Sequence, residues 1–357
     1  MFAIMRQGAV ERARSDCRKK GCEIYHGRRP RVGRRVVAES RGRAYPASTA
    51  SRCREPGATR SLADSVSPRP ILGVHGRALV KFMIPLILGI AALYLAICLL
   101  AFLGQRRLVY HPSRPSGARP EDLGLAYEDL TLVTSDGVRI HAWYFPVERA
   151  ERVVLMCHGN AGSIEDRLGH AEAITRMGQS FLIFDYRGYG RSEGKPDEEG
   201  TYRDSEAAYD WLRERGYRSE QIVAFGVSLG AAIAVELACR RELAALVIDS
   251  AFSSMLDVGR ETYPWLPVRY ILRIDYDSVS KIGGVDIPFL VFHSAGDRLI
   301  PIEQARRLYE AAPGPKKFVE TVGEHGDGSY LFRDEWLGEV ESFIVSAGES
   351  LGAKAKK

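Results

Sequence analysis

Residues 221–239 read QIVAFGVSLGAAIAVELAC, and this stretch decides the fold. An apolar run rich in strand-forming residues ends at Val227, a serine follows, and a helix of small apolar residues begins at Leu229. The two glycines of Gly226-Val227-Ser228-Leu229-Gly230 leave room for a tight turn between strand and helix. The pattern predicts that Ser228 is a nucleophile at the carboxyl edge of a parallel sheet.

The same five-residue pattern occurs again as Gly190-Arg191-Ser192-Glu193-Gly194. Here the serine lies among charged residues, and Lys195-Pro196 follows it where a helix would have to begin. Because proline and charged residues do not fit a buried turn between strand and helix, we interpret this second match as a loop.

A serine hydroxyl attacks a carbonyl carbon efficiently only when a base removes its proton and an acid orients that base. In a parallel sheet, such groups follow the ends of strands. Asp297 follows the apolar run FLVFHSAG, and His325 follows KFVETVGE. The chain order Ser228, Asp297, His325 is the one expected with a serine turn of this kind. Asp249 also follows a strand and is an alternative acid, whereas His293 lies inside a strand and is expected to be a packed core residue.

Acyl transfer also requires hydrogen-bond donors for the negative charge that develops on the carbonyl oxygen. The backbone N–H of Leu229 is one expected donor, because it lies at the positive end of its helix. The second donor is expected in the loop His158-Gly159-Asn160-Ala161-Gly162, which follows the strand RVVLMC. Gly159 allows a close approach of the backbone, and we assign the second donor to the N–H of Asn160.

Strand and helix patterns alternate from residue 121 to residue 346. Strands are predicted at 127–134, 138–147, 152–157, 181–185, 221–227, 243–248, 289–292 and 316–322, and helices at 163–177, 198–215, 229–239, 303–312 and 330–345. This alternation predicts one α/β domain with a mostly parallel sheet covered by helices on both faces. The short interval between Ile248 and Pro288 leaves room for at most a small lid. Residues 347–357 are expected to be a flexible tail.

Phe82 to Leu103 form a run of 22 residues without a charge, FMIPLILGIAALYLAICLLAFL. At about 1.5 Å per residue, a helix of this length reaches roughly 33 Å and can cross a hydrocarbon core of about 30 Å. We therefore expect one membrane-spanning helix at 82–103, joined to the domain by a connector at 104–120. The side on which the domain lies depends on where translation starts, because basic residues before the helix set its orientation.

Residues 1–80 contain 16 Arg and 2 Lys against 6 acidic residues, a charge of +12, whereas the rest of the chain carries −7. The overall net charge of +5 describes neither part and gives no reason to expect a nucleic-acid partner. Short apolar runs in this extension are always interrupted, so it cannot form a core. It is a solvated basic tail, an organelle transit peptide, or translated upstream sequence absent from a working protein that begins near Val80 or Met83.

Taken together, these segments resemble the α/β-hydrolases of the serine-hydrolase branch. The resemblance covers residues 105–345 and is carried by HGNAG at 158–162, DYRGYGRSEG at 185–194, GVSLG at 226–230, GDRLIP at 296–301 and GEHGD at 323–327. QRRLVYHPSRP, after the apolar run, and YPWLPVRY at 263–270 are most similar to membrane-anchored α/β-hydrolase-domain proteins, a group that includes protein depalmitoylases. The resemblance implies an eight-stranded sheet, neither metal nor organic cofactor, a triad of Ser228, Asp297 and His325, and an oxyanion hole at Asn160 and Leu229.

We therefore expect a membrane-anchored serine hydrolase of the carboxylesterase or thioesterase class, acting on an acyl ester or thioester that can be lipid-like. A peptidase of the prolyl-oligopeptidase type is an alternative, although the residues before the domain are too few for that family's propeller. A non-catalytic scaffold with the same fold is a second alternative, although such proteins usually lose one residue of the triad.

Overall fold

The computed structural model describes residues 74–113, 115–326 and 338–346. The predictions for the basic extension through residue 73 and for the tail at 347–357 lie outside these residues. Every element described below belongs to the unit Pro70–Lys357.

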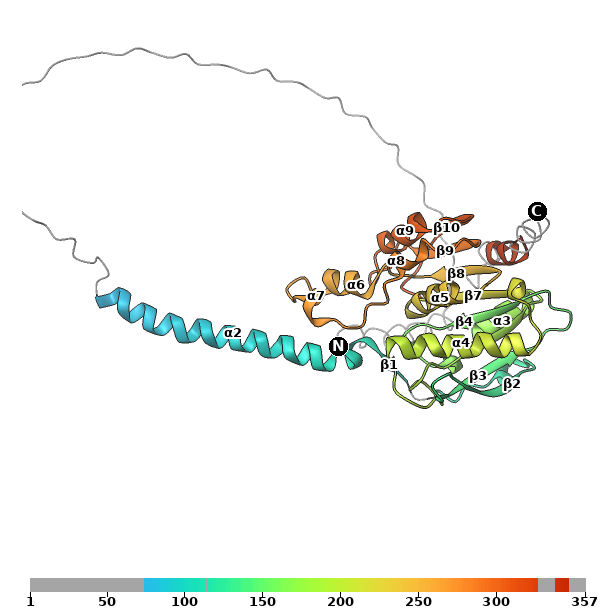
Figure 1. Ribbon diagram of the computed structural model, residues 1–357, viewed down its shortest axis with the longest axis horizontal. Helices are drawn as coiled ribbons and strands as arrows, with labels where there is room; N and C mark the ends of the chain where they lie inside the picture. Colours follow the sequence, from blue (N-terminus) through green and yellow to red (C-terminus); the bar gives the residue numbers. More distant parts are fainter. Residues whose placement is uncertain (1–73, 114, 327–337, 347–357) are drawn as a thin grey trace, which may run out of the picture. The chain divides into compact units, whose positions relative to one another are not determined.

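An eight-stranded sheet forms the centre of the domain (Figure 1). Its strands are β2 (Glu128–Val133), β3 (Arg139–Phe145), β4 (Val153–Cys157), β6 (Ser180–Phe184), β7 (Ile222–Val227), β8 (Ala245–Asp249), β9 (Phe289–Ser294) and β10 (Lys316–Thr321). They lie in the order β10-β9-β8-β7-β4-β6-β3-β2. Of these strands, β3 is antiparallel to both neighbours, and the pairs from β6 to β10 are parallel. The predicted mostly parallel, eight-stranded sheet is confirmed.

Alternate side chains of the central strands build two apolar cores, one on each face of the sheet. In β7, Ile222 and Ala224 belong to one core, whereas Val223 and Phe225 belong to the other. The first core is covered by α4 (Glu198–Glu214), α5 (Leu229–Arg240), α8 (Ser278–Ile282) and α9 (Ile302–Ala311). The second is covered by α3 (Leu168–Arg176) and by the helix at 338–346. Helices therefore cover both faces, as predicted.

Several short elements were not predicted. The segment between β8 and β9 contains α6 (Met255–Thr262), α7 (Val268–Ile271) and α8, which have 8, 4 and 5 residues and are too short to show a helical period. Two residues of β1 (His111–Pro112) pair with two residues of β5 (Ala161–Gly162) in a small separate sheet. The closing helix predicted at 330–345 is helical at 338–346, and its predicted beginning lies outside the described residues.

Helix α2 (Val74–Val109) precedes the domain. Its residues Leu79–Val109 form, within the described part of the chain, one helix that is long and apolar enough to cross a membrane. The helix ends six residues later than the predicted end at Leu103, so the first part of the predicted connector is helical. The extra turns have partners on the domain: Gln105 Oε1 accepts from the Arg273 N–H at 2.7 Å, and Arg106 lies 3.6 Å from Asp197.

Helix α5 begins in direct contact with the end of β4. A β-carbon on Gly230 would overlap the carbonyl oxygen of Cys157, and one on Gly226 would overlap the carbonyl oxygen of Gly230. Because backbone atoms cannot turn aside as a flexible side chain can, both positions require glycine. The turn that carries Ser228 is therefore packed between β4 and its own helix.

We expect Gly230→Ala to lower the free energy of unfolding by about 2 to 3 kcal/mol or more, because the new methyl group meets backbone. Gly283→Ala is the matched control, since Gly283 has a φ of −61° and a β-carbon there would meet only the Ala311 carbonyl oxygen, at 3.9 Å. Urea unfolding of both purified variants, followed by circular dichroism, measures the difference. Equal stabilities would contradict the close packing of α5 on β4.

Candidate active site

The carboxyl ends of four neighbouring parallel strands bring the three predicted catalytic residues together. Ser228 follows β7, Asp297 lies beyond β9, and His325 lies beyond β10. His325 Nε2 is 2.8 Å from Ser228 Oγ, and His325 Nδ1 is 2.6 Å from Asp297 Oδ2. With a neutral imidazole protonated at Nδ1, the serine hydroxyl donates to His325 and His325 donates to Asp297. This geometry allows His325 to take the hydroxyl proton.

The backbone at Ser228 adopts a conformation that is rare for a side-chain-bearing residue. Its φ is 54° and its ψ is −114°, which places it in the positive-φ region that favours glycine. The Ser228 N–H donates to the Asp249 carbonyl at 2.9 Å, and the Ser228 carbonyl accepts from the Ala231 N–H at 3.0 Å. These bonds and the glycine contacts hold the strained turn, and strain of this kind is typical of functional positions.

Asp297 is a buried carboxylate with several hydrogen-bond donors. Its Oδ1 accepts from the N–H groups of Leu299 and Ile300, both at 2.9 Å, while Oδ2 faces His325. Burial alone would raise the pKa of Asp297, but the hydrogen bond and charge of His325 and the two N–H groups lower it below the usual value. Asp297 therefore stays ionised and can orient and stabilise a protonated imidazole.

His293 also approaches Asp297, at 3.4 Å from Nε2 to Oδ2, but it lies fully inside β9. Burial lowers the pKa of His293 and favours its neutral form. Its Nε2 lies 2.9 Å from the carbonyl oxygen of Ile300, to which it can donate. This histidine supports the loop of Asp297 from within the sheet, as a packed core residue.

Asp249, the alternative acid, has a different environment. Its Oδ1 accepts from the Ser250 hydroxyl at 2.9 Å, and Ser250 Oγ accepts from the Gly326 N–H at 3.0 Å. Gly326 is the residue after His325, so this contact supports the loop that carries the histidine. Since His325 Nδ1 faces Asp297, the geometry favours Asp297 as the acid.

The two predicted oxyanion donors belong to the start of α5 and to the loop that follows β4. Leu229 begins α5, and within the described residues its N–H makes no hydrogen bond. Gly159, next to Asn160, lies against the turn: a β-carbon there would be 3.6 Å from the Val227 carbonyl oxygen and 3.8 Å from Ser228 Cβ. The geometry therefore brings the HGNAG loop beside the nucleophile, with a free donor at the helix N-terminus.

The contacts of the Asn160 side chain were not predicted. Its amide group donates to the carbonyl of Val109, the last residue of α2, and its Oδ1 accepts from the Tyr189 hydroxyl at 2.7 Å and from the His111 N–H at 3.3 Å. Tyr189 lies within the DYRGYG motif, but no spacing in the sequence links it to Asn160. These contacts tie the loop to the end of α2 and to the DYRGYG segment.

Two further histidines have shifted pKa values: His158 is fully buried, and His170, in α3, is partly buried. Burial lowers the pKa of His158 to about 4 and that of His170 to about 3, so both are neutral. Within the described residues, no group of three or more His, Cys, Asp or Glu side chains is arranged to hold a metal ion.

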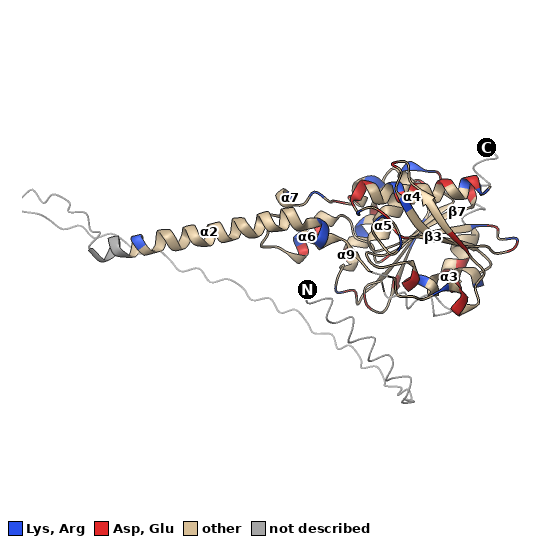
Figure 2. Cartoon of the chain, turned by 90° about the horizontal axis from the view of Figure 1, so that it is seen from below, with Lys and Arg blue, Asp and Glu red and all other residues tan. Residues whose placement is uncertain are grey.

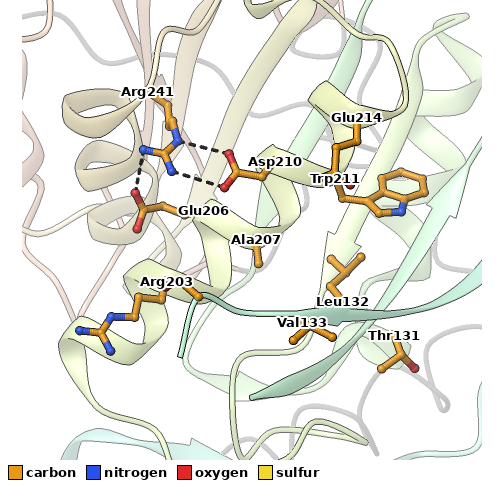
Figure 3. Close-up of a pocket in the computed structure, with 11 residues that line it drawn as sticks. Thr131, Leu132, Val133, Arg203, Glu206, Ala207, Asp210, Trp211, Glu214 and Arg241 are labelled. Carbon is orange, nitrogen blue, oxygen red and sulfur yellow. Dashed lines mark hydrogen bonds and ion pairs between the residues drawn. The ribbon is translucent and has the colours of Figure 1, made fainter. Parts of the chain in front are cut away.

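A pocket of about 380 Å³ lies elsewhere on the domain, between β2 and α4 (Figure 3). Two of its three acidic side chains pair with Arg241, which lies 3.0 Å from Glu206 and 3.4 Å from Asp210. None of the predicted catalytic residues lines it. This pocket is therefore separate from the hydrogen-bonded group of Ser228, His325 and Asp297.

Comparison with known proteins gives a consistent picture. Residues 152–274 match the family described as "alpha/beta hydrolase fold". The chain is 31% identical to the alpha/beta hydrolase domain-containing protein WAV2 of Arabidopsis thaliana, over 73% of this chain and 92% of that protein. It is 32% identical to an uncharacterized membrane protein of Saccharomyces cerevisiae, over 68% of this chain and 90% of that protein. An esterase structure from Pyrococcus furiosus has a TM-score of 0.57 at 23% identity, covering 66% of this chain and 98% of that chain, and shares the fold.

The lowered pKa of Asp297 predicts a pH-dependent contribution to stability. Because its folded pKa lies below its unfolded value of about 3.9, the carboxylate stabilises the folded chain above that pH, and the contribution is lost as the pH falls through the folded pKa. We expect the difference in free energy of unfolding between wild type and Asp297→Asn to be largest near neutral pH and to narrow below about pH 4.

Urea unfolding at a series of pH values measures this difference. Glu148→Gln is the control, because it removes a carboxylate whose side chain is 90% exposed and should leave stability nearly unchanged throughout. If the difference in free energy of unfolding between wild type and Asp297→Asn stayed constant down to about pH 3, it would contradict the lowered pKa of Asp297.

Proposed function

Since the chain belongs to the α/β-hydrolase family, we propose that it is a membrane-anchored serine hydrolase that cleaves a carboxylic ester or thioester. The observation that carries this proposal is the continuous hydrogen-bond chain from the Ser228 hydroxyl through His325 to Asp297. Such a chain activates a serine for attack on acyl groups. The solved structure from Pyrococcus furiosus is named as an esterase, and ester cleavage is the reaction proposed for this chain.

In the first half of the reaction, Ser228 Oγ attacks the acyl carbon and its proton passes to His325 Nε2. Asp297 holds the imidazole in the correct orientation and stabilises its positive charge. The carbonyl oxygen becomes an oxyanion, and the N–H groups of Leu229 and Asn160 donate to it. His325 then gives its proton to the departing alkoxide or thiolate, which leaves an acyl ester on Ser228.

In the second half, a water molecule replaces the leaving group. His325 takes a proton from this water as its oxygen attacks the acyl carbon, and the same two N–H groups stabilise the second oxyanion. When the bond to Ser228 Oγ breaks, His325 returns the proton to the serine. The acid is released and the free enzyme is restored without any cofactor.

The proposed anchor is α2. Its residues Leu79–Val109 have the length and hydropathy of a spanning helix, and none of the most apolar part is buried against the domain. The name of the yeast relative, a membrane protein, supports the same interpretation. A single-pass arrangement with an anchored domain suits a substrate that is itself held in a membrane.

Labelling with a fluorophosphonate probe tests the nucleophile. We expect wild type to be labelled and Ser228→Ala to lose labelling almost completely, because the probe reacts only with an activated serine. Fluorescence of the labelled protein on a denaturing gel measures the outcome.

Ser192→Ala is the matched control, since Ser192 occupies the second Gly-x-Ser-x-Gly pattern. Its hydroxyl donates to the Asp185 carbonyl at 2.7 Å and accepts from the His141 N–H at 2.8 Å, which indicates a structural role. This variant should remain labelled. Labelling of Ser228→Ala at the wild-type level would overturn the proposed mechanism, and a panel of esters, thioesters and peptide amides then distinguishes an esterase from a peptidase.

Asn160→Ala tests the positioning of the oxyanion loop. The variant keeps the backbone N–H but loses the side-chain bonds to Val109, Tyr189 and His111. We expect kcat on a soluble ester to fall about 10- to 100-fold with little change in KM, because a donor displaced by a fraction of an ångström stabilises the oxyanion less.

Tyr189→Phe removes one of these bonds and should give a smaller decrease than Asn160→Ala. Steady-state kinetics on folded protein, checked by circular dichroism, provides the comparison. A kcat for Asn160→Ala equal to that of wild type would show that the side chain does not position the loop.

A further inference from the structure

Residues 262–271, TYPWLPVRYI, form an exposed aromatic segment that we call the aromatic lobe. It includes the end of α6 and all of α7. Tyr263, Trp265 and Tyr270 are 47%, 56% and 79% exposed, and Arg269 is the one charged residue of the lobe. Three large aromatic side chains exposed on one short segment are unusual for a surface that faces water, and they indicate a contact surface.

The aromatic lobe lies beside α2 (Figure 2). The Tyr94 hydroxyl donates to the Trp265 carbonyl at 3.0 Å, and α7 packs against α2. Nearer the domain, Gln105 accepts from the Arg273 N–H, and the Arg273 guanidinium lies 5.8 Å from the centre of the Phe102 ring. The lobe therefore runs along the helix, away from the residues that join α2 to the domain.

These contacts fix how far the aromatic lobe reaches along the proposed anchor. Gln105 lies eleven positions after Tyr94, which corresponds to about 16 Å along the helix axis. A span needs about 20 apolar residues, so most of the charge-free segment from Phe82 to Leu103 must lie in hydrocarbon. Tyr94 is near the middle of that segment, and Trp265 lies at the same level.

Much of the backbone of the aromatic lobe is hydrogen-bonded within the protein. Four of its N–H groups donate to nearby carbonyls, at 2.8 to 3.0 Å: those of Tyr263, Leu266, Val268 and Tyr270. Pro264 and Pro267 have no N–H, and the Trp265 carbonyl accepts from Tyr94. Because an unsatisfied backbone group costs several kcal/mol in hydrocarbon, these bonds lower the cost of burying the lobe in a bilayer.

Two acidic residues at the base of the aromatic lobe, Asp257 and Glu261, contact the domain. Glu261 accepts from Gln304 at 2.8 Å and lies 3.6 Å from Arg307, and Asp257 lies 3.3 Å from Arg307. Both partners belong to α9, so these charges hold α6 to the domain. Arg269 is exposed, and its long side chain can extend to the headgroup region.

We propose that the aromatic lobe is a second membrane-embedded element, which enters one leaflet beside α2 and contacts lipid acyl chains through Tyr263, Trp265 and Tyr270. This inference rests on the proposed role of α2 as the anchor. The lobe leaves the sheet after β8, whose last residue, Asp249, pairs with Val227 directly before Ser228. The edge of the sheet that carries the nucleophile therefore faces the bilayer, and the substrate class is an acyl ester or thioester held in that leaflet.

Tryptophan quenching by brominated lipids tests the proposal. The full chain is reconstituted in phosphatidylcholine vesicles that carry bromine on the acyl chains, and Trp265→Phe is compared with wild type. We expect the substitution to remove more than half of the quenchable fluorescence. Trp211→Phe, which changes a tryptophan on α4 at the pocket beside β2, is the matched control and should leave the quenchable fluorescence unchanged.

Equal quenching of wild type and Trp265→Phe would overturn the proposal. Quenching of the Trp265 emission by aqueous iodide would also overturn the proposal, because it would place this side chain in water. Emission from Trp265 that neither quencher affects would overturn it too, because a second protein surface would then cover the lobe. Extraction of the vesicles with alkaline carbonate tests the anchor separately. Release of the chain from the vesicles would overturn both the proposed role of α2 as the anchor and the proposed embedding of the aromatic lobe. Ser228→Ala should leave all quenching unchanged, so a failure of the proposed catalysis does not affect this result.

Discussion

Helix α5 starts against the backbone of β4, and the geometry of the candidate site depends on this contact. Because Gly230 touches the carbonyl of Cys157, the N-terminus of α5 lies against the beginning of the HGNAG loop. Ser228, which directly precedes α5, has a positive φ in this tight turn. The strands beside β7 are parallel and in register, so the residues that follow β8, β9 and β10 reach the same edge. A packing contact between two backbones thus determines where a hydroxyl, an imidazole and a carboxylate meet.

Two carboxylates at this edge have different environments although they follow neighbouring strands. Asp297 faces His325 and two backbone N–H groups, which keep it ionised despite its burial. Asp249 accepts from Ser250, and Ser250 in turn binds the backbone next to His325. One acid therefore contacts the imidazole directly, while the other helps to fix the loop on which the imidazole is carried.

The sequence predicted those parts of the molecule that depend on local pattern. Ser228, Asp297 and His325 each follow a predicted strand, and parallel strands bring the residues that follow them to one edge of the sheet. The bonds from Asn160 to Val109 and to Tyr189 join residues that are 51 and 29 positions apart in the chain, and no local pattern encodes them. Helices α6 and α7 were missed because they are short and flanked by prolines, so their conformation depends on packing against α2 and α9 rather than on a helical period.

The bond between Asn160 and Val109 also affects how the domain can be studied in isolation. Val109 ends the helix proposed to cross the membrane, and its carbonyl is a partner of the loop proposed to bind the oxyanion. A chain shortened within α2 to obtain a water-soluble enzyme would also lose the helical turns that orient this carbonyl. Its turnover would then reflect a loosened loop as well as a missing anchor, so detergent or nanodisc preparations of the longer chain are the better reference for activity.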